Sequence, residues 1–95
     1  MDKILQNLGL CNRASGLISG IELVCEYMAS GRVYYIFLAN DASDNTKKKI
    51  RNKALYYNVE VDESYSSSEL SLAVGKINRM VLGVTQKGFL KILKK

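Results

Sequence analysis

Apolar side chains recur at spacings of three and four residues along much of the chain, and this period is typical of helices with one buried face. In the first such stretch, Leu5, Leu8 and Cys11 share one face, and Gly16 is expected to end the helix. Serine, aspartate and asparagine residues supply suitable caps before the later stretches. The pattern predicts helices over residues 2–14, 21–30, about 44–57, about 67–74 and 86–95.

The stretches between these helices have the composition of strands. Residues 33–39 (VYYIFLA) are continuously apolar, β-branched and aromatic, which is typical of a central strand buried on both faces. Residues 59–61 and 80–85 are expected to form two more strands, and residues 17–20 a short extended link that can pair at the edge of the sheet. The alternation predicts an α/β fold, a three-layer α-β-α sandwich around a central, largely parallel sheet.

The length of 95 residues fits a single domain over residues 1–95. The hydrophobic fraction of 47% and the charged fraction of 24% are ordinary for a soluble globular domain. Polar residues follow soon after the initial methionine, so no signal-peptide core is expected. The longest apolar run, about residues 33–39, is too short for a membrane span. These features predict a cytoplasmic protein with no membrane partner.

The absence of histidine argues against an enzyme, because it excludes Ser-His-Asp and Cys-His triads and histidine-bound metals. Cys11 and Cys25 do not form a Cys-x-x-Cys pair and are interpreted as small buried thiols. Asp41, Asp44 and Glu60 lack the spacing of a metal-binding loop. We therefore expect no catalytic residue, no metal, no cofactor and no small-molecule substrate.

The net charge of +5, from 14 basic and 9 acidic residues, favours a negatively charged partner, most often a nucleic acid. Three consecutive lysines, 47–49, end the stretch LANDASDNTKKK (38–49). Lys49, Lys53 and Tyr56 share one stripe of the predicted helix. Contact with phosphate groups is one interpretation. An ordinary solvated helix face is the other, and the residues alone leave both open.

Two glycine-containing segments are further candidates for binding. Gly20 lies directly before a predicted helix, so its amide and those that follow point outward and can meet an acceptor. A glycine that only starts the helix fits equally well. The loop 75–79 (GKINR) places Ile77 between two cations, Lys76 and Arg79. That combination suits a nucleic-acid groove, and a simple connection into the next strand is the alternative.

Four segments together resemble a known family: LGLCNRASGLISG (8–20), GIELV (20–24), LANDASDNTKKKI (38–50), and NVEV with SSELSLAVGKINRMVLGVTQKGF (58–89). The most specific parts are Ala-x-Asp-Ala-Ser-x-Asn-Thr after the buried strand, Leu-x-x-Ala-x-Gly before the last strand, and the spacing from Gly20 to Gly31. With these motifs the chain resembles the ribosomal protein family typified by the archaeal large-subunit protein L7Ae, and within it the small bacterial YlxQ-type branch.

The resemblance implies a three-layer α-β-α fold with a four-stranded mixed sheet and a non-catalytic RNA-binding function. Members commonly bind kink-turns, in which a bulge sharply bends a helix beside tandem sheared G·A pairs; another structured RNA, ribosomal RNA included, is also compatible. The implied surface joins a helix start, a strand end and a loop. Its residues here are Gly20, Ile21, Glu22, Leu23, Asn40, Asp41, Lys76, Ile77 and Arg79, and Arg13, Lys47 and Lys48 are added as candidates for phosphate contact.

Two positions depart from the family pattern. Gly16 stands where a lysine is usual, four residues before Gly20, and Glu26 stands where a lysine usually follows on the recognition helix. A glutamate there would repel a phosphate track as well as remove an attraction. The alternative hypothesis is therefore a protein-interaction module on the same fold that has lost specific RNA binding.

Overall fold

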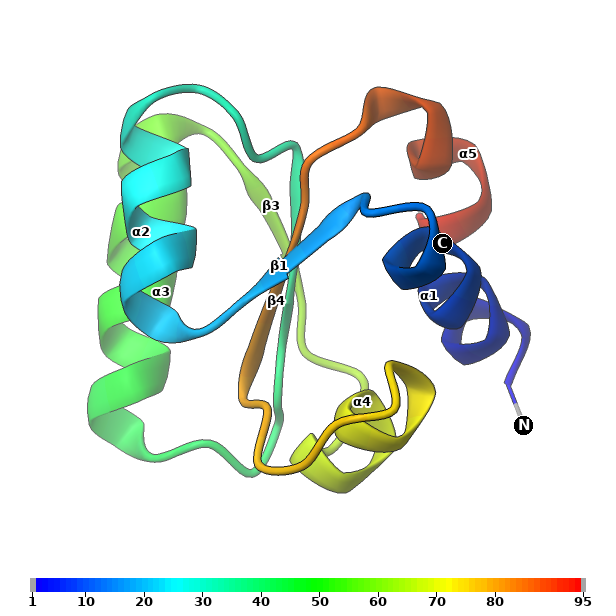
Figure 1. Cartoon of the computed structure of the whole chain (residues 1–95). Coiled ribbons are helices and arrows are strands. Elements are labelled where there is room, and N and C mark those ends of the chain that lie inside the picture. Colours follow the sequence, from blue (N-terminus) through cyan, green and yellow to red (C-terminus); the bar gives the residue numbers. More distant parts are fainter. Residues whose placement is uncertain (1, 95) are drawn as a thin grey trace.

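The computed structural model describes residues 2–94 and arranges them in three layers, with a sheet between two groups of helices (Figure 1). The helices are α1 (Lys3–Arg13), α2 (Ile21–Ala29), α3 (Asp44–Tyr57), α4 (Ser67–Ala73) and α5 (Leu90–Leu93). α2 and α3 cover one face of the sheet, and α1, α4 and α5 cover the other. The predicted three-layer α/β fold is confirmed.

The four strands within residues 2–94 form one mixed sheet in the order β1-β4-β2-β3. The strands are β1 (Leu17–Ser19), β2 (Tyr35–Leu38), β3 (Glu60–Asp62) and β4 (Val81–Val84). β2 and β3 pair in parallel, whereas β4 runs antiparallel to both β1 and β2. The mixed sheet implied by the family resemblance is confirmed, and the prediction of a largely parallel sheet is wrong.

The direction of β4 follows from the short helix before it. α3 has 14 residues and is about 21 Å long, which returns the chain to the edge where β2 began, so β3 runs parallel to β2. α4 has only seven residues and stays at the edge where β3 ends (Figure 1). β4 therefore starts at that edge and runs back between β1 and β2. The alternation of helices and strands predicts the layers but does not reveal this reversal.

The core lies on both faces of the two central strands. Every residue of β2 and β4 is buried, which confirms the prediction for the first of them. The ring of Phe37 is fully buried and meets Tyr35 edge to face at a centroid distance of 5.2 Å. Leu8, Val24 and Ile50 reach the core from the helix layers and are also fully buried. These contacts pack both helix layers against the two central strands.

The helix ends agree with the caps expected from the sequence. Ser43 precedes α3, and its hydroxyl accepts a hydrogen bond from the Thr46 amide. Asn58 ends α3 in the left-handed conformation, with φ of 60°. Ser66 and Glu69 form a reciprocal capping box at the start of α4. Capping therefore fixes where the chain enters and leaves both helices.

The C-terminal helix is shorter than predicted. A helix over residues 86–95 was predicted, and residue 95 lies outside the described residues. Within residues 86–94 the chain forms a 3₁₀ turn, η1 (Lys87–Phe89), followed by the four-residue α5. Gly88 lies in the turn, and glycine weakens helical structure. Only part of the expected apolar face is covered, since Leu93 is fully buried whereas Ile92 is 41% exposed.

Candidate nucleic-acid interface

Three segments that are far apart in the sequence meet at one edge of the sheet (Figure 1). They are the start of α2, the joint between β2 and α3, and the loop from α4 to β4. The Gly20 amide donates a hydrogen bond to the Val81 carbonyl at 3.2 Å. The Ala39 amide donates to the Met80 carbonyl at 2.8 Å. These bonds connect the three segments, so they share one surface.

α2 begins without a capping side chain. Gly20 precedes it with φ of 104° and ψ of 142°, a conformation that residues with a side chain rarely adopt. A Cβ at Gly20 would meet no atom within 4 Å, so the backbone conformation and not lack of space favours glycine. The amides of residues 21–23 have no acceptor within the helix, and the helix dipole adds a partial positive charge. This helix start can therefore donate to an electronegative group of a ligand.

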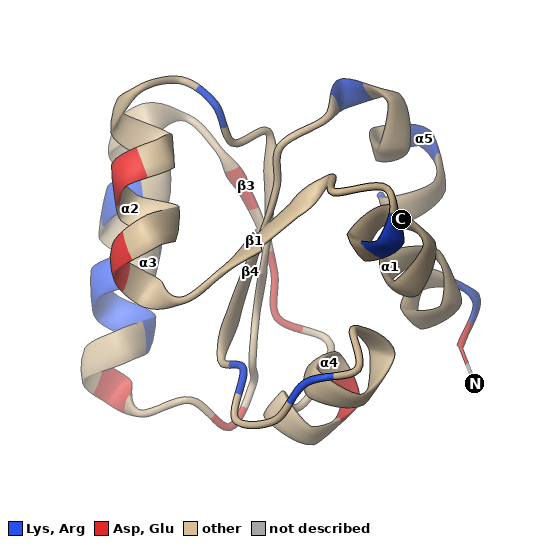
Figure 2. Ribbon diagram, in the orientation of Figure 1, with Lys and Arg blue, Asp and Glu red and all other residues tan. Residues whose placement is uncertain are grey.

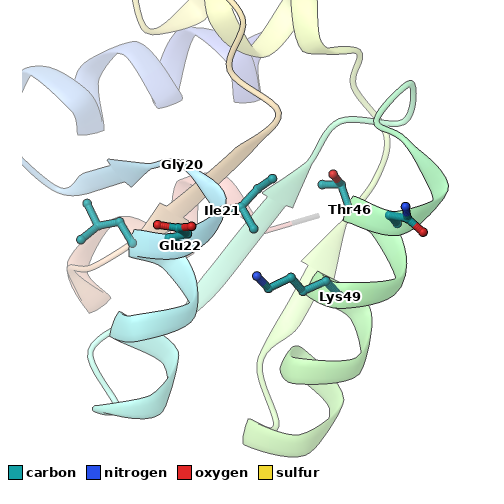
Figure 3. Close-up of a pocket in the computed structure, with 7 residues that line it drawn as sticks. Gly20, Ile21, Glu22, Thr46 and Lys49 are labelled. Carbon is teal, nitrogen blue, oxygen red and sulfur yellow. The ribbon is translucent and has the colours of Figure 1, made fainter.

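An open hollow of about 470 Å³ lies between the start of α2 and the first turns of α3 (Figure 3). We call it the first hollow. Its lining residues are Gly20, Ile21, Glu22, Leu23, Asn45, Thr46 and Lys49. The side chain of Lys49 extends from α3 toward α2, on the side where Glu22 lies. The first hollow thus combines helix-start amides, a carboxylate and an ammonium group.

A second hollow, of about 120 Å³, shares Gly20 and Ile21 with the first. Its other lining residues are Asn78, Arg79, Met80 and Val81. The backbone amide of Arg79 donates to Ser71 Oγ at 2.8 Å, which holds the loop on α4. The Arg79 Nε is buried and has no hydrogen-bond acceptor among residues 2–94. Buried donors are normally paired, so this N–H is an exception beside the second hollow.

Asn40 and Asp41 lie at the same edge in different environments. The Asp41 carboxylate accepts hydrogen bonds from the Ser67 amide at 2.8 Å and from the Ser67 hydroxyl at 2.9 Å. These bonds hold the pKa of Asp41 below its usual range, and the charge of Lys47 adds to the effect. Asp41 therefore joins the end of β2 to the start of α4. Asn40 is exposed beside it.

The basic residues of α3 divide between two sides of the helix. Lys49 lines the first hollow. Lys47 is two residues earlier and therefore points to the other side of the helix. Its charge helps to lower the pKa of Asp41, after the larger effect of Ser67. It also helps to lower the pKa of Glu63, after the larger effect of Arg51. Figure 2 shows that Lys and Arg also occur on the loop after α4, with acidic residues nearby. One of the three consecutive lysines thus lines a hollow and another faces away from it.

Lys48, Lys76 and Ile77 are exposed and line neither of the two hollows. Ile77 is 78% exposed, so the loop presents an apolar side chain to the solvent. Six lining residues are not among the predicted site residues: Asn45, Thr46, Lys49, Asn78, Met80 and Val81. Asn45 and Thr46 lie four and three residues before Lys49. From this spacing the sequence could have predicted that the three residues share one face of the helix.

Arg13 lies in the other helix layer, at the end of α1. It lines a third hollow, of about 340 Å³, together with Gly9, Asn12 and residues 72–75. The side-chain nitrogen of Asn12 donates to the Val74 carbonyl at 3.2 Å and holds α1 against the end of α4. Arg13 thus lies near the beginning of the loop 75–79 and lines neither hollow at the start of α2.

The two departures from the family pattern have different settings. Gly16 is buried, and a Cβ there would lie 2.7 Å from Cys11 Sγ and 3.2 Å from the Cys11 carbonyl oxygen. Any side chain at this position would therefore have to displace Cys11, whatever the protein binds. Glu26 is exposed on α2, one turn beyond Glu22, so its charge does face the solvent near the first hollow.

Residues 2–94 contain neither a cluster of metal ligands nor a membrane-spanning helix. No three or more His, Cys, Asp or Glu side chains in this range are grouped so that they could hold a metal ion. In the same range, no helix has the length and apolar character needed to cross a bilayer. Both cysteines are free thiols, Cys11 buried and Cys25 partly buried.

The model of the ribosomal protein L7Ae/L30e/S12e/Gadd45 family matches residues 2–94 of the chain. The protein belongs to this family. The membership confirms the resemblance seen in the motifs, and the family model spans all the segments that form the first and second hollows.

Two relatives in the family are named RNA-binding protein YlxQ. The one from Enterococcus faecium is 40% identical over 89 residues, which cover 94% of this chain and 85% of the relative. The one from Bacillus subtilis (strain 168) is 40% identical over 82 residues, which cover 86% of this chain and 82% of the relative. The chain therefore matches members of the YlxQ-type branch over most of their length.

Solved structures share the fold. A protein of unknown function from Bacillus halodurans has a TM-score of 0.94 at 36% identity, with 98% of this chain and 94% of that chain covered. The Giardia lamblia 15.5kD RNA binding protein has a TM-score of 0.80 at 13% identity, with 96% and 78% covered. At 13% identity the second likeness shows the fold alone.

Proposed function

We propose that the protein is a non-catalytic RNA-binding protein that clamps a bent or bulged RNA at the sheet edge where α2 begins. The observation that carries the proposal is the uncapped start of α2, which lies between Lys49 in the first hollow and Arg79 in the second. The names of the two YlxQ relatives and the net charge of +5 support it. In this proposal no residue takes part in a chemical reaction.

The chemistry of the two hollows suits exposed base edges. Amides at the start of α2 donate to guanine O6 and N7, and the Glu22 carboxylate accepts from base amino groups. Lys49 and Arg79 neutralise phosphates on either side, which releases counterions and makes the affinity depend on salt. Ile77, which is 78% exposed, packs on an unstacked base. Base recognition thus lies at the centre of the site and phosphate contacts lie at its margins.

The need for these contacts favours a distorted RNA over a regular duplex. In an A-form helix the major groove is too deep and narrow for side chains to reach the base edges, whereas bulges and bends expose them. The amides at the start of α2 need accessible base edges, and Ile77 needs an unstacked base. A distorted RNA offers both within one site. We therefore propose a kink-turn, the class implied by the family resemblance, as the RNA that the protein binds.

Equilibrium binding to a kink-turn hairpin tests this proposal, with an uninterrupted duplex of equal length as the control. At moderate salt we expect the kink-turn hairpin to bind more tightly. Equal affinity for the two RNAs would reject recognition of a bent shape. Absence of binding to both would reject RNA as the partner of this surface.

A further inference from the structure

One stripe of α3 leads away from the first hollow. Lys49, Lys53 and Tyr56 are spaced by four and three residues, so they lie along the same side of the helix. Lys49 lines the first hollow, and Tyr56 lies about 10 Å further along the helix axis. The stripe therefore begins inside the proposed RNA site and continues beyond it.

The stripe ends at the exposed ring of Tyr56, which packs against the ring of Tyr57. Tyr56 is 81% exposed. Its ring meets Tyr57 edge to face, with a centroid distance of 4.8 Å and an interplanar angle of 88°. The spacing of Tyr57 from Ile50 and Ala54 predicts that it faces the core, but it is 37% exposed and supports Tyr56 at the surface. The arrangement orients Tyr56 and leaves most of its ring open to a ligand.

The charge along α3 indicates what kind of ligand fits. The helix contains five basic residues and one acidic residue, Asp44. Arg51 is paired with Glu63, with Nε 2.8 Å from a carboxylate oxygen, on the other side of the helix from Lys49. The stripe with Lys49 and Lys53 thus keeps its positive charge and ends in an open aromatic ring. Cations followed by a stacking platform are the features that bind single-stranded nucleic acid.

We propose that α3 extends the RNA site: an unpaired strand next to the bend lies along the stripe, with phosphates at Lys49 and Lys53 and a base stacked on Tyr56. This inference rests on the proposed function. The carboxylates of Glu22 and Glu26 on α2 repel phosphates, so the strand lies on the α3 side of the space between the two helices. The strand is read by stacking and charge, without preference for one base.

Kink-turn hairpins with and without an unpaired extension test the inference. One hairpin is blunt, and two others carry about six unpaired uridines at the 5′ end or at the 3′ end. The wild-type protein is expected to bind one extended hairpin more tightly than the blunt one, by about tenfold for one stacked base. Tyr56→Ala is expected to remove this difference and leave binding of the blunt hairpin unchanged. Tyr56→Phe, which keeps the aromatic face, is expected to retain it.

Leu55 supplies the matched control, because it is 83% exposed and lies about 100° round the helix from Tyr56. Leu55→Ala is expected to keep the preference for the extended hairpin. Equal binding of blunt and extended hairpins, or a preference that survives Tyr56→Ala, would overturn the inference and leave the proposed function intact. Failure to bind any of the hairpins would overturn both.

Discussion

At the residue scale, Gly16 shows how packing and not ligand binding can determine an unusual position. A Cβ at this position would lie 2.7 Å from Cys11 Sγ and 3.3 Å from Phe89 Cδ2, so α1, the chain before β1 and the turn η1 meet there. A sequence motif shows only that a lysine is missing. The three-dimensional packing gives the reason for the glycine, and the cation is still missing from this position.

Gly16→Ala is therefore expected to lower the free energy of unfolding by about 1–3 kcal/mol, because the added methyl group overfills a packed site. Denaturant unfolding of the variant measures it. Gly88→Ala is the matched control, since a Cβ at Gly88 meets nothing within 4 Å. A Gly16→Ala protein as stable as the wild type would contradict the packing described for this position.

Cys11 leads to a prediction about pH. Burial raises the pKa of its thiol to about 11 from an ordinary 9.0, and burial likewise raises the pKa of Tyr35 to about 12 from 10.0. The unfolded chain loses these protons first, so the folded state becomes less stable as the pH rises above 9. Urea unfolding between pH 8 and pH 11 measures the loss. Cys11→Ala should show a smaller loss between pH 9 and 10; an identical pH dependence would exclude Cys11 as its source.

At the element scale, local signals predicted the helices of the α2 and α3 layer well. Ser43 and Asn58 are residues with a known preference for the two ends of a helix, so α3 could be placed before its packing was known. The direction of β4 could not be predicted, because it depends on where α4 lies at the end of the sheet. The C-terminal segment was overpredicted, since its apolar spacing fits a helix but the structure covers only part of that face.

The same division applies to the site. Gly20 and the loop 75–79 could be proposed from local chemistry and from family motifs. Lys49 could not be selected from three consecutive lysines, because that choice depends on α3 packing beside α2. The role of Asp41 at the start of α4 also depends on a contact with Ser67 that is 26 residues away in the sequence.

The two helices beside the first hollow give a prediction about charge. Glu26 lies one turn beyond Glu22 on α2, and both carboxylates oppose phosphates near Lys49. Glu26→Lys is expected to tighten binding of the kink-turn hairpin by up to roughly fivefold, because an exposed ion pair contributes about 0.2–1 kcal/mol. Fluorescence anisotropy at fixed salt measures it, with Glu26→Gln as an intermediate control. Weaker binding by Glu26→Lys would place the phosphates elsewhere.

At the scale of the whole molecule, the proposed binding surface is formed by segments from both halves of the chain. Lys49 lines the first hollow and Arg79 lines the second. Arg79→Ala and Lys76→Ala are expected to weaken binding of the kink-turn hairpin. Each is also expected to reduce the slope of log affinity against log salt by roughly 0.7–0.9 for every phosphate that the variant no longer neutralises. A salt titration of the variants measures this, and unchanged slopes would show that these side chains do not contact phosphates.

The most direct test of the account maps the RNA on the protein. ¹⁵N-labelled protein is titrated with the kink-turn hairpin, and chemical-shift changes are followed for the backbone amides. We predict the largest changes at residues 20–23, 45–49 and 76–79, because these segments surround the first and second hollows. Largest changes at the opposite end of the sheet, around residues 30–34 and 85–89, with the α2 start unaffected, would contradict it.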